Sequence, residues 1–208
     1  MTPAPPFPAA PTTPPSPTEM ISDLDTPSRL SLSALLEFPF GPGKPFQVTS
    51  NAVLSRIIGG WQLSPIYTYQ SGVPIQFGTD FFFNGDPTTM ALPSDQRTVT
   101  RWFNTANFVT ASTAQPDHHV RTMPLRFSGV RYQNFSNWDF SLIKNTKLTE
   151  GKSIQFKIEA LNAMNHPLLN NGTVTATVNP TSTAFGSTVG KNMGNYARRF
   201  QLGLKFIF

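Results

Sequence analysis

Apolar and polar residues alternate along several segments of the chain, most clearly in its last nine residues. Every second position from 200 to 208 is apolar, namely Phe200, Leu202, Leu204, Phe206 and Phe208. The positions between them include Gln201, Gly203 and Lys205. Two residues is the side-chain period of a β-strand. The pattern therefore predicts a strand with one wholly apolar face, ending on an aromatic residue.

The same period predicts four further strands. Even positions are apolar in residues 30–40, and the sequence GPGKP (41–45) ends that run. In residues 61–70 the apolar parity is odd and carries Trp61, Leu63, Tyr67 and Tyr69, although Pro65 weakens the strand because it lacks an N–H. In residues 138–143 and 154–160 the even positions are apolar again, beginning with Trp138. The charges of the last three strands share the opposite parity: Asp139, Lys157, Glu159 and Lys205.

Parity also constrains the turn between residues 143 and 154. Cross-strand partners must share a face, and the apolar face is even-numbered on both sides of the turn. A three-residue loop, Thr149-Glu150-Gly151, pairs Leu142 with Ile158 and Lys144 with Phe156. Its last position favours a left-handed backbone, which Gly151 adopts without steric cost.

Short and long connections between the strands are expected at opposite ends of the sheet. Residues 41–58 and 149–151 fall at one end of an antiparallel sheet, and the longer stretches 78–131 and 165–195 at the other. Short periplasmic turns and long extracellular loops are typical of outer-membrane barrels. We therefore predict an all-β fold, an antiparallel up-and-down sheet that forms part of a large transmembrane β-barrel. A secreted β-sandwich for binding or adhesion, whose short strands alternate similarly, is the alternative.

Composition narrows the possible functions. Charged residues make up only 13% of the chain, about half the usual share, and aromatic residues 12%. Cysteine is absent, which excludes disulfides and zinc–thiolate sites. No apolar run approaches the roughly 18 residues of a membrane helix. The net charge of +5 is not gathered in a basic block, so we expect no nucleic-acid partner.

The N-terminal residues 1–22 form a proline-rich segment that we expect to be disordered, and residues 23–208 form the barrel portion. The first basic residue is Arg29, so the chain does not begin with the basic and apolar regions of a signal peptide. Since a barrel must be exported, we expect this chain to be the C-terminal part of a longer protein, or its start to be wrongly assigned. A flexible tail on a cytoplasmic domain is the alternative.

Candidate chemistry is sparse. The run Asp117-His118-His119, with His166 as a third histidine, invites a metal site, but adjacent histidines do not easily share one ion. Asp139 and Glu159 resemble a glycosidase pair, but Lys157 on the same parity favours a solvated charge cluster. We expect no catalytic residue, no metal and no cofactor, and hence no enzyme. The long loop 78–131, rich in Phe and Arg, is a candidate ligand contact.

Four segments resemble the end of Oar-like, TonB-dependent-receptor-type outer-membrane proteins, a family with a carboxypeptidase-regulatory-like domain that is common in acidobacterial genomes. They are GGWQLSPIYTYQSGVP (59–74), RWFNTANF (101–108), NWDFSLIKNTKLTEGKSIQFKIEALNAMNHP (137–167) and RRFQLGLKFIF (198–208). The resemblance covers about residues 23–208, and residues 137–167 are its most specific part. In this family a signal peptide, the regulatory-like domain and a plug precede the barrel, and no segment of this chain matches them.

The resemblance implies the wall of a receptor or transporter pore in the bacterial outer membrane. The implied partners are outer-membrane lipid, the barrel-assembly machinery, the remaining strands and plug of the parent protein, and an unknown transported ligand. Residues 200–208 resemble the C-terminal assembly signal, with its apolar positions Phe200, Leu202, Leu204, Phe206 and Phe208. Asp139, Lys157, Glu159 and Lys205 are then expected to face the lumen, and Trp61, Tyr67, Tyr69 and Trp138 to lie at the membrane interfaces.

Overall fold

The structure, a computed structural model, describes residues 20–41, 43–46, 51–77, 83, 85–114, 123–168, 178–188 and 196–208. Most of the proline-rich segment lies outside the described residues, and so do Asp117, His118 and His119.

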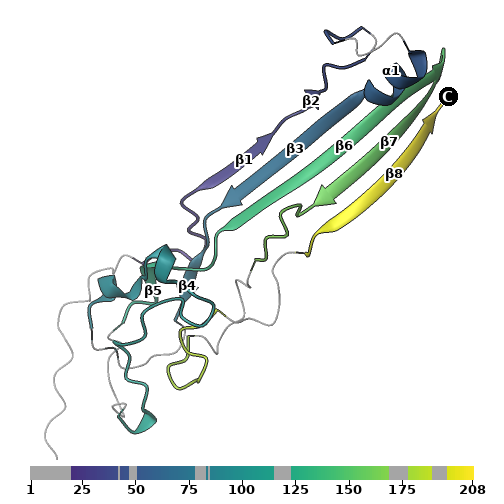
Figure 1. Ribbon diagram of the computed structural model, residues 1–208. Coiled ribbons are helices and arrows are strands. Elements are labelled where there is room, and N and C mark those ends of the chain that lie inside the picture. The colour runs from purple at the N-terminus through teal and green to yellow at the C-terminus, as the bar shows by residue number, and fades with distance from the viewer. Residues whose placement is uncertain are drawn as a thin grey trace, which may run out of the picture.

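One antiparallel sheet dominates the molecule (Figure 1). Its strands are β1 (Arg29–Ser33), β2 (Leu36–Glu37), β3 (Trp61–Gln70), β6 (Phe135–Thr149), β7 (Lys152–Leu161) and β8 (Arg199–Ile207). The order across the sheet is β1-β3-β6-β7-β8, with β2 beside β3 after β1. Strands that lie side by side in this sheet also follow one another along the chain. This confirms the predicted up-and-down, all-β arrangement. Within the described residues, the outer edges of β1 and β8 have no neighbouring strand.

The predicted strand over residues 30–40 is interrupted. β1 ends at Ser33 and β2 begins at Leu36, yet both continue the same register against β3. That register places Ala34 opposite Pro65, whose nitrogen has no hydrogen to donate. Only the reverse hydrogen bond forms, from the Ala34 N–H to the Pro65 carbonyl at 3.2 Å. Pro65 therefore weakens the ladder without ending strand β3.

The turn between β6 and β7 differs slightly from the prediction. Leu142 pairs with Ile158 and Lys144 with Phe156, as parity required. The register then shifts between Lys147 and Thr149, so that Thr149 pairs with Lys152 and the tight turn is Glu150-Gly151. The predicted three-residue loop is therefore wrong by one residue, because a β-bulge absorbs the change of parity. Gly151 adopts the expected left-handed conformation, with φ of 82°.

The two ends of the sheet differ as the connection lengths predicted. The β6–β7 turn, the C-terminus and the short helix α1 (Ala52–Ile58) gather at one end (Figure 1). The long connections 71–134 and 162–198 leave from the other end. The helix itself was not predicted; Asn51 caps it by accepting hydrogen bonds from the N–H groups of Val53 and Leu54. No helix among the described residues is long and apolar enough to cross a membrane.

The long connections fold into a small structure of their own, which we call the loop lobe and define as the described residues of 72–132 and 178–188. It contains the strand pair β4 (Pro74–Gln76) and β5 (Arg126–Arg131), and three single-turn 3₁₀ helices: η1 (Pro87–Met90), η2 (Ser94–Gln96) and η3 (Ser112–Ala114). The buried core of the described chain lies here and not on the sheet: Ile75, Phe77, Phe83, Met90, Leu92, Phe103, Phe108, Met123, Phe127 and Val130.

Phe77 lies at the centre of this core and is only 1% exposed. Its ring centroid is 5.4 Å from that of Phe103 and 5.1 Å from that of Phe127, both in edge-to-face contact, and 5.7 Å from that of Phe108. Such ring pairs contribute about 0.5–1.5 kcal/mol beyond the area that they bury. The loop lobe is therefore held together by aromatic packing.

Phe77→Ala should unfold the loop lobe locally while leaving the sheet intact. A buried Phe→Ala change costs about 3–5 kcal/mol, which is most of the stability that so small a core can supply. Limited proteolysis and hydrogen exchange should show faster cleavage and exchange in residues 75–130, with β6 and β7 unchanged. Phe46→Ala is the control, because Phe46 is 59% exposed. Equal protection of the lobe in the Phe77 variant would contradict this account.

Candidate functional site

The broad surface of the sheet is the principal candidate site, because the register sorts side chains onto two chemically opposite faces. One face, here called the apolar face, collects the apolar parity of every strand. Leu32 lies opposite Tyr67, Leu63 opposite Leu142, and Ile158 opposite Leu202. Its remaining large apolar members are Leu30, Leu36, Tyr69, Trp138, Phe140, Ile154, Phe156, Phe200, Leu204 and Phe206. The predicted alternation is thus continuous across all the neighbouring strands.

Aromatic rings form a contiguous row on this face. The rings of Tyr67 and Trp138 are stacked with centroids 4.6 Å apart, and Trp138 stacks on Phe140 at 5.7 Å. Tyr67 and Trp138 lie toward the loop-lobe end of β3 and β6, and Tyr69 lies beyond them, while Trp61 begins β3 at the opposite end. The four aromatics predicted for the membrane interfaces thus lie toward both ends of the apolar face.

The opposite face, here called the polar face, carries hydrogen-bonding side chains. Lys157 Nζ lies 2.7 Å from Glu159 Oε1, and Ser141 Oγ donates to the same carboxylate oxygen at 3.2 Å. Gln155 Nε2 donates to Asn145 Oδ1 at 2.9 Å. The Ser141–Glu159 and Gln155–Asn145 hydrogen bonds join β6 to β7, whereas Lys157 and Glu159 both lie on β7. The Lys157 and Glu159 side chains are partly exposed.

The four predicted charges lie on this polar face but serve different purposes. Lys157 and Glu159 pair with each other, and Lys205 is opposite Gln155 in the register. Asp139 Oδ1 instead accepts hydrogen bonds from the Asn162 N–H at 2.8 Å and from Asn137 Nδ2 at 2.9 Å. Asp139 therefore also fixes the exit from β7 into the long connection.

The apolar residues of the terminal strand are solvent-exposed in this chain. Leu202 is 71% exposed, Leu204 75%, and Phe208 90%. Phe206 and Phe208 contact each other, with ring centroids 5.8 Å apart. A strand of exposed apolar residues with an unpaired edge is unfavourable in water and needs a covering environment.

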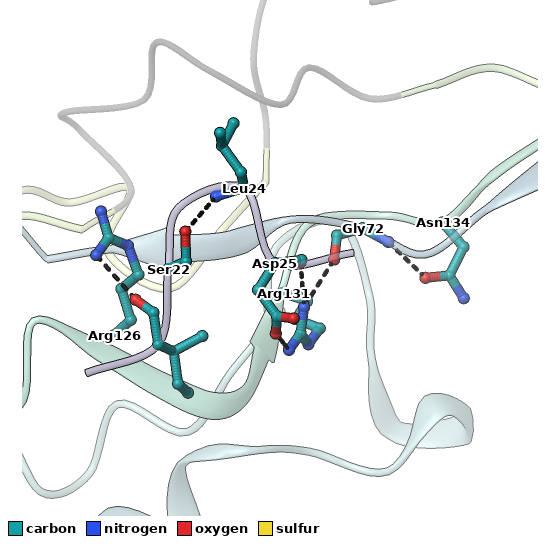
Figure 2. A network of polar contacts seen from close by, with 8 residues as sticks. Ser22, Leu24, Asp25, Gly72, Arg126, Arg131 and Asn134 are labelled. Carbon is teal, nitrogen blue, oxygen red and sulfur yellow. Dashed lines mark hydrogen bonds and ion pairs between the residues drawn. The ribbon is translucent and has the colours of Figure 1, made fainter. Parts of the chain in front are cut away.

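Two arginines of β5 hold the segment before β1 against the loop lobe (Figure 2). Arg126 Nη1 donates to the Ile21 carbonyl at 3.0 Å, and Arg131 Nη1 donates to the Asp25 carbonyl at 2.8 Å. Arg131 also forms an ion pair with the Asp25 carboxylate and reaches the Gly72 carbonyl at 3.3 Å. We call residues 20–25 the strap. The sequence pointed to an Arg-rich loop, but it gave no sign of what the arginines bind.

A cavity of about 600 Å³ lies where the strap meets the loop lobe. Its lining is mainly apolar and includes Met20, Ile21, Met123 and Phe127, with Arg126 as the charged member. The Arg126 Nε is buried and makes no hydrogen bond within the described residues. The cavity lies against the loop 78–131 that the sequence suggested as a ligand contact.

Titratable groups of the loop lobe are tuned by their surroundings. Burial raises the pKa of the Tyr132 phenol, which packs against the aromatic core. The backbone N–H of Thr88 donates to Asp86 Oδ1 at 2.8 Å and lowers the pKa of that carboxyl. Asp86 is therefore ionised at neutral pH and caps η1. Both groups have structural roles.

No cluster of His, Cys, Asp and Glu suited to a metal ion occurs among the described residues. His166 lies on the connection after β7, where its backbone N–H donates to Asn162 Oδ1 at 3.0 Å. Asp139 and Glu159, the pair considered for glycoside hydrolysis, are engaged with Asn162 and with Lys157.

Comparison with known proteins gives one family. A family model described as an outer membrane beta barrel domain matches residues 8–201, nearly the whole chain. Comparisons with curated proteins and with solved structures gave no match.

Arg131→Ala should release the strap from the loop lobe. The variant loses two hydrogen bonds to backbone carbonyls and the ion pair with Asp25, and charge-assisted bonds contribute about 1.5–3 kcal/mol each. Backbone amides of residues 21–26 should exchange at least about tenfold faster, since tenfold corresponds to about 1.4 kcal/mol. Arg29→Ala, at the exposed start of β1, is the matched control. Unchanged exchange in the Arg131 variant would show that the strap is held by other contacts.

Proposed function

Because the chain belongs to the family of outer-membrane β-barrel domains, we propose that it forms the C-terminal wall of a TonB-dependent receptor or transporter pore. The sheet is barrel wall in an outer membrane. The single observation that carries the proposal is the unbroken apolar face, which joins every neighbouring strand from β1 to β8. The receptor class rests on the resemblance of residues 59–74, 101–108, 137–167 and 198–208 to Oar-like proteins.

The length of the strands suits this role. β3 has 10 residues and therefore extends about 33 Å. Tilted by about 40°, as strands of such barrels are, it spans about 25 Å, which is the height of the apolar band. The aromatic residues toward both ends of the apolar face then lie at the two membrane interfaces, where amphipathic rings are favoured.

In the proposed barrel the polar face lines the lumen. Asp139, Lys157, Glu159 and Lys205 keep their charges in water there, which costs little, whereas the same charges on the apolar face would meet lipid. The loop lobe and the strap, at one end of the sheet, then face the outside of the cell, and the β6–β7 turn at the other end faces the periplasm, as the short-turn rule of these barrels requires. The plug of the parent protein and the transported ligand would contact the polar face.

A secreted β-sandwich is less well supported. A sandwich needs a second sheet packed about 10 Å from the first over its apolar face. Among the described residues, the second sheet is only the short β4–β5 pair, and it lies beyond the end of the large sheet (Figure 1). Leu202 and Leu204 remain more than two-thirds exposed. Lipid fulfils the need for a covering environment without a second sheet.

The chain on its own should not form a closed barrel. Among the described residues the sheet has six strands, fewer than the eight or more of closed single-chain barrels, and the outer edges of β1 and β8 are unpaired. Each unpaired backbone group in lipid costs several kcal/mol, so the purified chain should associate or aggregate in detergent. A folded monomer whose mobility on a gel shifts on heating would contradict this expectation.

Deleting Phe208 from the full-length parent protein should lower the amount that reaches the outer membrane. The terminal aromatic is proposed to be read by the barrel-assembly machinery, and Phe208 is 90% exposed and therefore accessible. Phe208→Tyr should largely preserve assembly, because a similar aromatic ring remains. Fractionation and surface labelling of a tagged extracellular loop would follow the levels. Normal levels after deletion, with Phe208→Ala also tolerated, would remove the assembly-signal assignment.

A further inference from the structure

Helix α1 exposes apolar side chains although it is short and lies outside the sheet. Val53 is 68% exposed, Leu54 44% and Ile57 58%. Arg56 is also exposed, whereas Ser55 and Ile58 are partly covered. An exposed cluster of this kind on so small an element needs a partner surface.

The C-terminal end of α1 is attached to the apolar face of the sheet. Trp61 Nε1 donates to the Ile57 carbonyl at 2.9 Å. Lys144 Nζ donates to the Arg56 carbonyl at 2.5 Å and also to the Gly59 carbonyl. Trp61 and Lys144 are direct cross-strand partners on the apolar face, and the ammonium lies 5.5 Å from the indole centroid. Lys144 thus supplies a positive charge to the carbonyls at the end of the helix.

Close backbone contacts keep α1 in this position. A Cβ added at Gly59 would lie 2.9 Å from the Gly41 Cα, and one added at Gly60 would lie 2.3 Å from the Asn145 carbonyl oxygen. Gly60 also has a φ of 76°. The helix is therefore joined to the sheet by a tightly packed link and does not swing freely.

Trp61 and Lys144 mark the boundary of the apolar band. Trp61 is the first residue of β3, at the end of the sheet that carries the β6–β7 turn (Figure 1). Tryptophan and snorkelling lysine side chains are favoured where hydrocarbon meets water. Because α1 contacts the sheet at these two residues, its exposed apolar side chains lie close to this end of the apolar face.

We propose that α1 is an interfacial helix that lies in the periplasmic headgroup layer of the outer membrane. Val53, Leu54 and Ile57 enter the boundary between headgroups and acyl chains, and Arg56 supplies a cation for lipid phosphate. This inference rests on the proposed function, because it requires the apolar face to meet lipid. The helix then anchors the rim of the barrel in the plane of the membrane, as amphipathic helices do elsewhere.

Spin labelling can test the position of α1, and because this chain has no cysteine, each introduced cysteine is the single labelling site within it. The variants are Leu54→Cys on α1, Leu202→Cys on the apolar face, Gln201→Cys on the polar face, and Val99→Cys in the loop lobe. Val99 is a matched control, being 45% exposed against 44% for Leu54. Because this chain alone should not form a closed barrel, each variant would be made in the full-length parent protein, with any cysteine outside this chain replaced by serine, and placed in bicelles of phosphatidylcholine and phosphatidylglycerol. Two collision rates of each nitroxide are measured: with oxygen, which is more concentrated in lipid, and with a nickel chelate, which stays in water. Their quotient, the oxygen-to-nickel ratio, is high for a label in lipid and low for a label in water.

The oxygen-to-nickel ratio at Leu54→Cys should exceed that at Val99→Cys several-fold and approach that at Leu202→Cys. A ratio typical of lipid at Leu202→Cys together with a ratio typical of water at Leu54→Cys would overturn the α1 inference alone. Water-like values at both overturn the proposed function and, with it, this inference. A label at position 54 that neither reagent reaches, beside a lipid-like Leu202, shows that protein covers the helix, such as a second copy of the chain, and also overturns it.

A charge variant gives an independent readout. Ile57→Glu, measured with a label at Val53→Cys, should shift the oxygen-to-nickel ratio toward the water value, because a carboxylate is expelled from the acyl boundary. Val99→Glu in the same labelled background is the control and should leave the ratio unchanged. The same ratio with and without Ile57→Glu would overturn the interfacial placement.

Discussion

A sheet in lipid must pair its backbone N–H and C=O groups within the protein, because hydrocarbon offers them no partner. The ladders of β3, β6 and β7 satisfy this constraint, since each of these strands is hydrogen-bonded on both sides. β1 and β8 do so on one side only, within the described residues. The stability of the sheet in a membrane therefore depends on strands that supply these two missing ladders.

The distribution of apolar side chains follows from the same environment. In a soluble domain the largest apolar surfaces are buried inside, whereas here the sheet turns them outward. Leu204 is 75% exposed while Phe77, in the loop lobe, is 1% exposed. The lobe lies beyond the end of the large sheet and has a conventional buried core of its own. The chain thus combines a wall whose apolar face is completed by lipid with a lobe whose core is completed by its own aromatic rings.

At both ends of the sheet, strand side chains make specific polar contacts with the connecting segments. At the loop-lobe end, Arg126 and Arg131 bind backbone carbonyls of the strap, so the segment before β1 is part of the lobe. At the opposite end, Trp61 and Lys144 bind the last carbonyls of α1. In both places a side chain from a strand satisfies backbone groups that regular structure leaves unpaired. These contacts define where the sheet stops and its connections begin.

The alternation of residues by itself determined the strands and their faces, because a period of two is a local property of extended backbone. It also determined the pairing of Leu142 with Ile158, since partners must share a face, and the left-handed Gly151. Even the weakness at Pro65 is local, as a missing N–H cannot be restored by tertiary contacts. The fold of the loop lobe, the attachment of the strap and the position of α1 were decided only by the tertiary structure. Arg131 binds a residue 106 positions away, and Lys144 binds a helix 85 to 88 positions away. Contacts at such separations depend on which strand ends lie close together in space. The local alternation of residues carries no information about that proximity.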